Sequence, residues 1–316
     1  TSSAAFVHSN FHLSEVTTLF AGLRYTNEEK SIDSRPGGRA DWVAILNMST
    51  DRRQLDLDSE NVSWTIGLRH NITDDAMLYA SISTGTKAGA FNTVGTLANG
   101  TDPRALSVDD ENIISYEIGA KTTWYDGRLG LNGAIFYSDY EDYQVQKVVQ
   151  VGTLPDGSVL TAAIFDNAAE LTAKGAELEV FAAPSGGLRI TVGISYLDSI
   201  IDKFEGASNP FGIVVDASGN QNPLSPEWSF NLAVDYERQL SNGGSFVTNF
   251  DYEYKDSYFS DLNITNHPDG VTPSLGRLGG RVGFRSADER WGVYLWGKDL
   301  TDEDKPIQRL IAGRGG

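Results

Sequence analysis

The sequence predicts an all-β fold, an antiparallel transmembrane β-barrel. Three observations favour it. Apolar and polar residues alternate with a period of two in many segments, as in strands that have one apolar and one polar face. Short and long connections follow each other in strict alternation. No run of about 18 apolar residues occurs, so the sequence excludes a membrane-spanning helix.

Composition narrows the classes of function. The 25 Lys and Arg are outnumbered by 43 Asp and Glu, which gives a formal net charge of −18. Nucleic-acid binding needs clustered basic residues that neutralise phosphates, so the sequence excludes DNA and RNA as partners. The chain has no Cys, which excludes disulfides and thiolate zinc sites. Its many aromatic residues and 33 Gly suit a membrane barrel and a soluble β-sandwich alike.

The expected strands are too long for most sandwiches and long enough to cross a bilayer, which takes roughly 9 to 11 residues. We expect twelve strands, centred near residues 4–12, 17–28, 61–70, 76–88, 112–124, 128–146, 168–182, 188–199, 226–238, 245–256, 275–285 and 290–299. Short turns are expected near residues 14–15, 71–74, 125–127, 184–187, 241–244 and 286–289. Long loops are expected at 30–58, 88–110, 148–166, 200–224 and 258–274. In membrane barrels the short turns are periplasmic and the long loops lie outside the cell.

Residue parity assigns side chains to the two faces of these strands. Apolar residues are expected to face lipid and polar residues to face the lumen. The expected lipid-facing set is Leu131, Ile135, Ile190, Val192, Ile194, Phe230, Leu232 and Val234, and the polar set includes Asn132, Thr191 and Asn231. The expected lumen-facing charged residues are Arg24, Arg69, Lys87, Glu117, Lys121, Glu177, Glu179, Arg189, Asp251 and Arg281. They would form either a track for a polar solute or simply a hydrated wall.

Six strings in chain order resemble strands of the TonB-dependent receptor family. They are LFAGLRYT at 19–26, LYASISTGTKAGAFN at 78–92, YEIGAK at 116–121, KGAELE at 174–179, PEWS at 226–229 and WGKDLT at 296–301. The resemblance implies a 22-stranded barrel in the bacterial outer membrane, in which the strands of this chain are the tenth to the twenty-first. Residues 1–316 are therefore expected to form one partial barrel, without the plug domain and the closing strand. We expect this chain alone not to close.

The resemblance also implies active uptake of a scarce nutrient, most often a ferric siderophore or a similar iron chelate. The implied partners are outer-membrane lipid, the receptor's own plug domain, the TonB complex acting through a missing amino-terminal part, and the small-molecule chelate. Uptake of haem, cobalamin or a glycan by the same mechanism stays open. So does a passive or adhesive barrel.

Candidate sites are few, and no enzyme, cofactor or metal site is expected. His8 and His12 share one expected strand but lie too far apart along it for a common metal, and His70 and His267 fall on other elements. An acidic stretch could offer oxygen ligands to calcium, but it lacks the glycine-containing loop of a defined site and suits a solvated surface better; it comprises Asp51, Asp56, Asp58 and Glu60. Aromatic residues in the long loops are candidates for ligand contact or, equally, for packing of the loops; they are Phe91, Phe204, Phe211, Tyr258 and Phe259.

Overall fold

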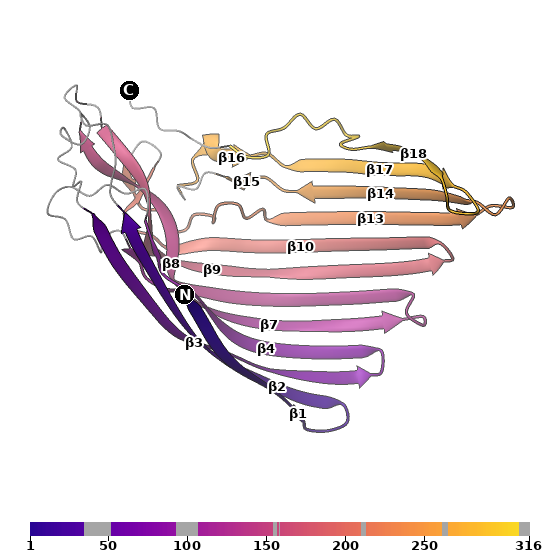
Figure 1. The fold of residues 1–316 in the computed structure, drawn as a ribbon, viewed down its shortest axis with the longest axis horizontal. Coiled ribbons are helices and arrows are strands. Elements are labelled where there is room, and N and C mark those ends of the chain that lie inside the picture. Colours follow the sequence, from indigo (N-terminus) through magenta and orange to yellow (C-terminus); the bar gives the residue numbers. More distant parts are fainter. Residues whose placement is uncertain are drawn as a thin grey trace.

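The fold is one curved antiparallel sheet of twelve strands (Figure 1). The computed structural model describes residues 1–34, 52–92, 107–153, 157, 159–209, 213–260 and 265–309. The strands of the sheet are β1 (Ser2–His12), β2 (Thr17–Ser34), β3 (Arg53–Thr73), β4 (Ala76–Lys87), β7 (Glu111–Trp124), β8 (Leu129–Thr153), β9 (Val159–Ser185), β10 (Leu188–Lys203), β13 (Trp228–Gln239), β14 (Ser245–Lys255), β17 (Leu275–Arg285) and β18 (Gly292–Gly297). No helix in the described residues is long and apolar enough to cross a membrane.

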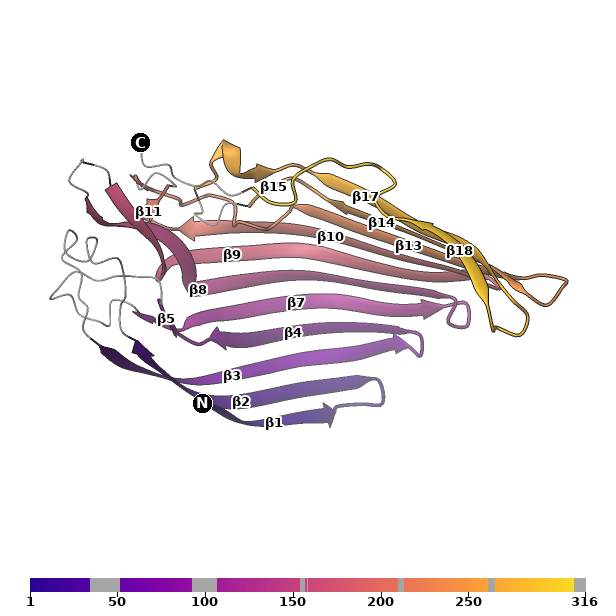
Figure 2. The same ribbon diagram turned by 45° about the horizontal axis from the view of Figure 1, so that its top comes forward.

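Every strand of the sheet pairs with its neighbours in the sequence. Figure 2 shows the same succession, with indigo β1 at one edge and yellow β18 at the other. The sequence prediction of twelve antiparallel strands is confirmed in number and order. The sheet is open, because β1 and β18 are its two edges and are not paired with each other.

The short turns are confirmed at one end of the sheet, called here the short-turn end. Between β7 and β8, Tyr125, Asp126 and Gly127 have φ values of 56°, 55° and 83°. Between β13 and β14, the Asn242 side chain accepts a hydrogen bond from the Gly244 backbone N–H at 3.0 Å. Such left-handed conformations and side-chain caps reverse the chain within few residues.

The opposite end, called the long-loop end, carries three short two-stranded pieces that the sequence did not predict. They are β5 (Ala90–Phe91) with β6 (Ser107–Val108), β11 (Ala207–Ser208) with β12 (Val214–Val215), and β15 (Tyr258–Phe259) with β16 (Val271–Thr272). A 3₁₀ turn, Pro268–Gly270, precedes β16.

Two expected loops are corrected by the structure. Both ends of the first, residues 30–58, belong to strands, because β2 extends to Ser34 and β3 begins at Arg53. The sequence prediction treated residues 148–166 as a loop, but β8 extends to Thr153 and β9 begins at Val159. The pairing register shifts between Tyr140 and Tyr143, and Asp142 has a φ of 54°. This bulge bends the hairpin, whose far part turns out of the line of the other strands in Figure 1. The stretch is rich in Val and other apolar residues, so its composition suits a strand pair that continues beyond the rest of the sheet, and treating it as a polar loop was wrong.

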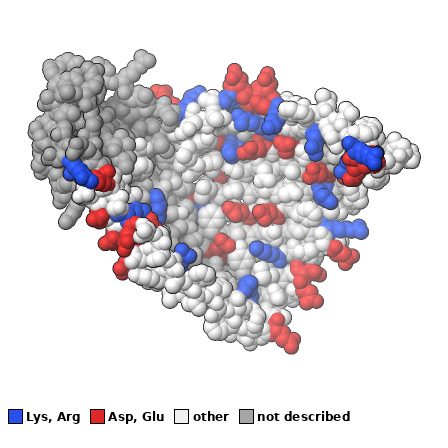
Figure 3. All heavy atoms as spheres, viewed as in Figure 1, with Lys and Arg blue, Asp and Glu red and all other residues white. Residues whose placement is uncertain are grey.

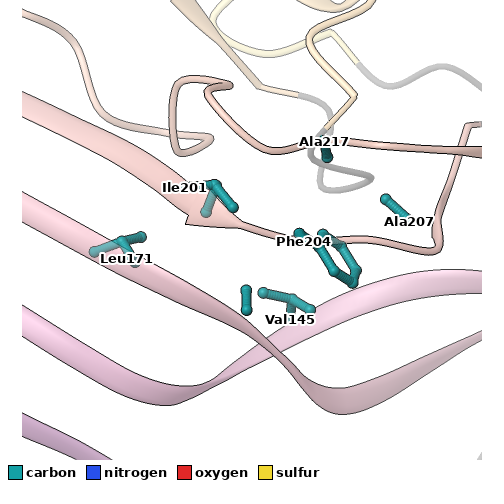
Figure 4. Close-up of a cluster of buried hydrophobic side chains, with 7 residues drawn as sticks. Val145, Leu171, Ile201, Phe204, Ala207 and Ala217 are labelled. Carbon is teal, nitrogen blue, oxygen red and sulfur yellow. The ribbon is translucent and has the colours of Figure 1, made fainter.

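Beyond the bulge, the protein has a conventional hydrophobic cluster, called the outer cluster. It contains Val145, Ala169, Leu171, Ile201, Phe204, Ala207 and Ala217, all at most 4% exposed. Figure 4 shows these side chains gathered between the β8–β9 hairpin and the segment that follows β10. The Ala217 backbone N–H donates to the Phe204 carbonyl at 3.0 Å, which closes that segment onto the cluster.

Candidate functional site: the polar face and its long-loop end

The pairing register divides the sheet into two faces. Paired residues lie on the same face, so Val180, Val192, Leu232 and Tyr252 form one row across four strands. The adjacent row on the other face begins with Lys121 and continues through Asn132, Glu179, Gly193, Asn231 and Glu253 to Arg277. We call the first the apolar face and the second the polar face.

The structure places all ten predicted charged residues on the polar face. Each placement is read from the pairing of neighbouring strands, because paired residues share a face. Glu117 is paired with Ser81, for example, and Arg189 with Asp235. Figure 3 shows acidic and basic side chains spread over the middle of the sheet on the face in view. The eight residues expected to face lipid all lie on the apolar face, as the same register shows.

Three of the predicted cations lie over aromatic rings. The Arg69 guanidinium is 5.3 Å from the centroid of Phe20, and the Lys121 ammonium is 5.9 Å from that of Tyr79. The Arg281 guanidinium is 5.2 Å from the ring of Tyr294. These distances are those of cation–π contacts. The sequence analysis did not consider these aromatic residues. The alternation within their strands nevertheless places Phe20 and Tyr79 on the same face as the charged residues.

Glycine makes room for these rings against the sheet. The Tyr79 ring lies on Gly119, where an added Cβ would come within 2.5 Å of the ring. In that position the Tyr79 hydroxyl donates to the Glu117 carboxylate at 2.5 Å. The aromatic ring therefore covers bare backbone and leaves the carboxylate oriented on the polar face.

Further polar-face residues pair with one another near the short-turn end. The Asn249 amide donates to the Asp235 carboxylate at 2.9 Å. The Arg285 guanidinium forms an ion pair with Glu237. A cavity of about 880 Å³ adjoins this region and is lined by Arg128, Arg189 and Asp235 among others.

The loop aromatics divide into different environments. Phe204 is 1% exposed inside the outer cluster, so its ring serves packing, one of the two roles that the sequence left open. Phe91 in β5 is half-buried, as are Tyr258 and Phe259 in β15. Phe211 lies outside the described residues.

Tyr258 borders a cavity of about 260 Å³ that reaches the polar face. The cavity is also lined by Glu253, Lys255 and Arg277. Lys255 pairs with Glu253 at 2.8 Å, whereas the Nε of Arg277 is buried without a hydrogen-bond partner. The Tyr258 hydroxyl donates to the Ile307 carbonyl at 2.9 Å, which fixes the ring at the cavity wall. The cavity thus combines an aromatic ring with two cations and one carboxylate.

A second recess at the long-loop end was missed by the sequence analysis. It has a volume of about 240 Å³ and lies beside the bulge of β8. Tyr140 and Tyr143 meet edge to face there, with ring centroids 5.7 Å apart, and Asn222 and Ser225 complete the polar part of the wall. The sequence assigned Tyr140 and Tyr143 to a strand, so they were not considered with the loop aromatics.

The acidic residues considered for calcium lie along an extended strand. Asp56, Asp58 and Glu60 occupy alternate positions of β3, and Asp51 is outside the described residues. Across the described parts of the chain, no three His, Asp or Glu side chains are grouped to hold a metal ion.

Two carboxylates in connections have lowered pKa values. The Ser218 hydroxyl and then its backbone N–H hold the pKa of Asp216, beyond β12, below its usual value. In the turn after β17, the Ser286 hydroxyl and then the Arg290 backbone N–H do the same for the pKa of Asp288. Each carboxylate is stabilised in its ionised form by hydrogen-bond donors of its own turn.

Comparison with known proteins places the chain in a family. Residues 1–300 match the model of the TonB-dependent receptor-like β-barrel. The chain is similar to the probable TonB-dependent siderophore receptor PiuA of Acinetobacter baumannii, with 26% identity over 84% of this chain and 32% of the relative. It is also similar to a ferric-pyoverdine receptor, PbuA, of a Pseudomonas strain, with 24% identity over 95% of this chain and 32% of the relative. The chain thus spans about a third of the length of these curated relatives.

Solved structures share the fold. The ferric yersiniabactin uptake receptor FyuA of Yersinia pestis has a TM-score of 0.73 at 18% identity, over 96% of this chain and 41% of that one. The siderophore receptor PiuA of Acinetobacter baumannii has a TM-score of 0.73 at 21% identity, over 96% and 39%. The twelve-stranded sheet with its two faces is therefore a piece of an outer-membrane barrel wall, and the chain belongs to the TonB-dependent receptor-like β-barrel family.

Proposed function

We propose that this chain is part of a receptor for TonB-dependent uptake of a ferric siderophore or a similar iron chelate across the bacterial outer membrane. The observation that carries the proposal is the two-faced wall, whose polar face leads to the Tyr258 cavity at the long-loop end. A soluble sheet would have to bury its apolar face. Here large apolar side chains such as Ile118 and Ile135 are 59% and 58% exposed in the middle of the sheet.

In this proposal the apolar face meets lipid. Aromatic rings flank its aliphatic middle, as they do at both interfaces of membrane barrels. Tyr116 and Tyr137 lie on neighbouring strands toward the long-loop end, with ring centroids 6.4 Å apart, and Trp124 lies at the short-turn end. Trp124 lies eight positions beyond Tyr116, which at roughly 3.4 Å per residue is about 27 Å along the strand. With a strand tilt of roughly 40°, that length spans about 21 Å of bilayer thickness, close to the apolar band of about 25 Å in membrane barrels.

The polar face is then the lumen wall, and the long loops are outside the cell. The Tyr258 cavity suits an anionic organic chelate, because Arg277 and Lys255 supply positive charge and the tyrosine supplies an aromatic surface. Siderophore, pyoverdine and yersiniabactin appear in the names of the similar receptors. The ten charged residues of the polar face would serve as a hydrated wall against the plug or as contacts for the solute.

The partners follow from the same proposal. The whole receptor would have 22 strands, a plug domain that contacts the polar face, and a TonB-contacting segment outside residues 1–316. The paired charges near the short-turn end, such as Glu237 with Arg285, would present a polar surface to the plug.

Iron uptake by cells tests the proposal. A strain without the gene should grow less well than its parent under iron limitation and should take up less radiolabelled iron from the cognate ferric chelate. Uptake should also stop in a strain that lacks TonB. Unchanged uptake in the gene deletion, with other siderophore receptors removed, would contradict the iron-chelate assignment. Uptake that persists without TonB would indicate a passive barrel.

Another solute taken up by the same mechanism is the second candidate. The copper transporter OprC has a TM-score of 0.70 with this chain at 13% identity, so the same barrel wall is found in a protein named for a different cargo. Comparing uptake of labelled iron chelates with uptake of copper in the deletion strain separates the two.

A further inference from the structure

The recess of about 240 Å³ beside the bulge of β8 lies on the polar face. Its wall on β8 begins at Phe136, which is paired with Glu117 of that face. Two residues further along β8, Ser138 forms one row with Ala173 of β9 and Ser199 of β10. The recess therefore belongs to the same face as the predicted charged residues.

The bulge brings a second tyrosine to this face. Tyr140 and Tyr143 are three residues apart, so in a regular strand their side chains would point to opposite faces. They are instead paired with Leu171 and Ala169, which are two residues apart and therefore share a face. The irregularity lies at Asp142, whose φ of 54° is left-handed. Bulges next to binding sites redirect side chains in this way.

The recess has the size of a single ring. Its volume is below the roughly 300 Å³ at which pockets for whole organic ligands begin, but above the about 150 Å³ of a cavity that holds benzene. Tyr140 and Tyr143 pack against the outer cluster, which holds their rings in place. Their edge-to-face contact forms an aromatic wall against which another ring can pack in the same geometry.

The lining of the recess is uncharged. No Asp, Glu, Lys or Arg lines it in the part of the chain that the structure describes. A charged group placed there would lose its hydration without gaining a counter-ion. The polar groups are hydroxyls and one amide, and two of the hydroxyls are already used: Ser138 donates to Ser115 at 2.9 Å, and Ser225 donates to the Pro223 carbonyl at 3.3 Å.

Ser199 supplies a hydroxyl that the fold does not use. The residue is 3% exposed and lines the recess, yet among the described residues its hydroxyl has no hydrogen-bond partner. A buried hydroxyl without a partner lowers stability, and most such groups in folded proteins are paired. The position of this hydroxyl in the recess therefore points to a ligand that completes the bond.

The recess is tied to the Tyr258 cavity by one short segment. The Asn222 backbone N–H donates to the Ser199 carbonyl at 2.8 Å, and the Leu224 N–H donates to the Phe259 carbonyl at 2.8 Å. Phe259 is the neighbour of Tyr258 in β15. The uncharged recess and the charged cavity are thus linked at the long-loop end.

We propose that the recess binds one uncharged aromatic ring that carries a hydroxyl, as a part of the transported solute. Tyr140 and Tyr143 hold the ring, and Ser199 forms a hydrogen bond with its hydroxyl. The Tyr258 cavity takes the anionic part of the same solute. The assignment of the ring to a solute rests on the proposed function, whereas binding of the ring is measured without any uptake.

Binding of para-fluorophenol to the full-length receptor that contains this chain tests the recess. Broadening of the fluorine NMR signal gives the Kd in detergent at neutral pH, where the phenol is uncharged. Fluorobenzene, which lacks the hydroxyl, is the paired probe. Ser199→Ala should weaken binding of para-fluorophenol about two- to tenfold, the effect of one neutral hydrogen bond, and should leave fluorobenzene unchanged.

Two further variants locate the binding. Ser195→Ala removes a hydroxyl from the same strand and face outside the recess and should change neither Kd. Ala173→Leu fills the recess and should abolish binding of both probes. The heat-dependent shift of each variant on gels verifies folding.

The outcomes separate the recess from the cargo. Absence of para-fluorophenol binding, equal weakening by Ser195→Ala and Ser199→Ala, or binding that survives in folded Ala173→Leu would overturn the proposal. If the expected pattern appears while iron uptake is unchanged in the gene deletion, the recess is upheld and only the iron-chelate assignment fails.

Discussion

Large apolar side chains are exposed in the middle of the sheet and buried in the outer cluster. On the apolar face, Ile118 is 59% exposed, and its neighbour across the strands, Ile135, is 58% exposed. In the outer cluster, Ile201 and Phe204 are at most 1% exposed. Both regions share the strands β8 and β9, yet only one of them builds a core.

The difference reflects the solvent on each side of the interface. Apolar residues in lipid gain nothing by being buried in protein, because hydrocarbon is as apolar as a side chain. Where the hairpin passes into water, the hydrophobic effect acts again and apolar side chains must be covered. The outer cluster is therefore expected to behave as a small soluble domain attached to a membrane wall.

The largest expected effect is in the outer cluster. Phe204→Ala should destabilise the local fold by about 3–5 kcal/mol, the usual loss for a buried Phe. Hydrogen exchange of the Ala217 amide, which donates to the Phe204 carbonyl, measures the local opening. Phe165→Ala is the matched control, because this ring is 51% exposed on β9, a strand that also contributes residues to the cluster. Equal protection of the Ala217 amide in both variants would mean that the cluster contributes no stability.

A smaller effect is expected at the lipid interface. Leu232→Arg should cost about 2–4 kcal/mol if it lies near the bilayer midplane, and Asn231→Arg, on the polar face, much less. The measurement is the free energy of folding of the full-length receptor into lipid vesicles. Similar costs at the two neighbouring positions would contradict the assignment of lipid to one face and water to the other.

The loop aromatics should affect binding more than stability. Replacing Tyr258 and Phe259 with Ala in the full-length receptor should weaken chelate binding by about 1–3 kcal/mol if they are anchors, as expected for aromatic contacts. Titration of labelled ligand on cells measures this. Asn242→Asp at the short-turn end keeps the acceptor for Gly244 and serves as the control. If the Asn242 variant bound the chelate more weakly and the Tyr258 and Phe259 double variant bound it normally, the assignment of the outer and inner ends of the barrel would be inverted.

The smallest effect concerns pH in two connections. The pKa of Asp216 near the outer cluster and that of Asp288 in a short turn are both lowered in the folded chain. The stabilisation is therefore present above the unfolded pKa, roughly 4, and is lost as pH falls through the folded value. The protection factors of the amides in each turn, which are corrected for the intrinsic pH dependence of exchange, should fall in that acidic window, and Asp216→Asn or Asp288→Asn should remove the dependence for its own turn only. Protection factors that fall on going from pH 5 to pH 7 would contradict the sign.

The twelve-stranded sheet and its two faces could be predicted from sequence because the alternation of apolar and polar residues is a local property of each strand. Alternation assigns each residue to a face without knowledge of any partner strand, and it placed residues as far apart as Arg24 and Arg281 on the polar face. The turns after β7 and β13 were found in the same way, from residues that adopt tight turns.

The long-loop end could not be predicted because its contacts are non-local. Phe204 is packed by residues from β8, β9 and the segment around Ala217, and none of these contacts follows from a period in the sequence. Tyr143 was placed correctly on a strand, but only the bulge at Asp142 and the approach of Asn222 make it part of a recess. The pairing of β3 with β4 ends at Thr65 opposite Ser83, and this too does not follow from the alternation in either strand.

The neighbour-only order of the strands has a consequence for how the wall is assembled. Each strand pairs with the strand next to it in the sequence, so β7 and β8, joined by a turn around Asp126, can form a hairpin with little loss of chain entropy. Topologies with such local pairing form quickly for their size. The wall can therefore grow by adding one hairpin to the last, and in a complete barrel only the pairing of its first strand with its last joins segments that are far apart in the chain. That seam is where assembly of the receptor would be slowest.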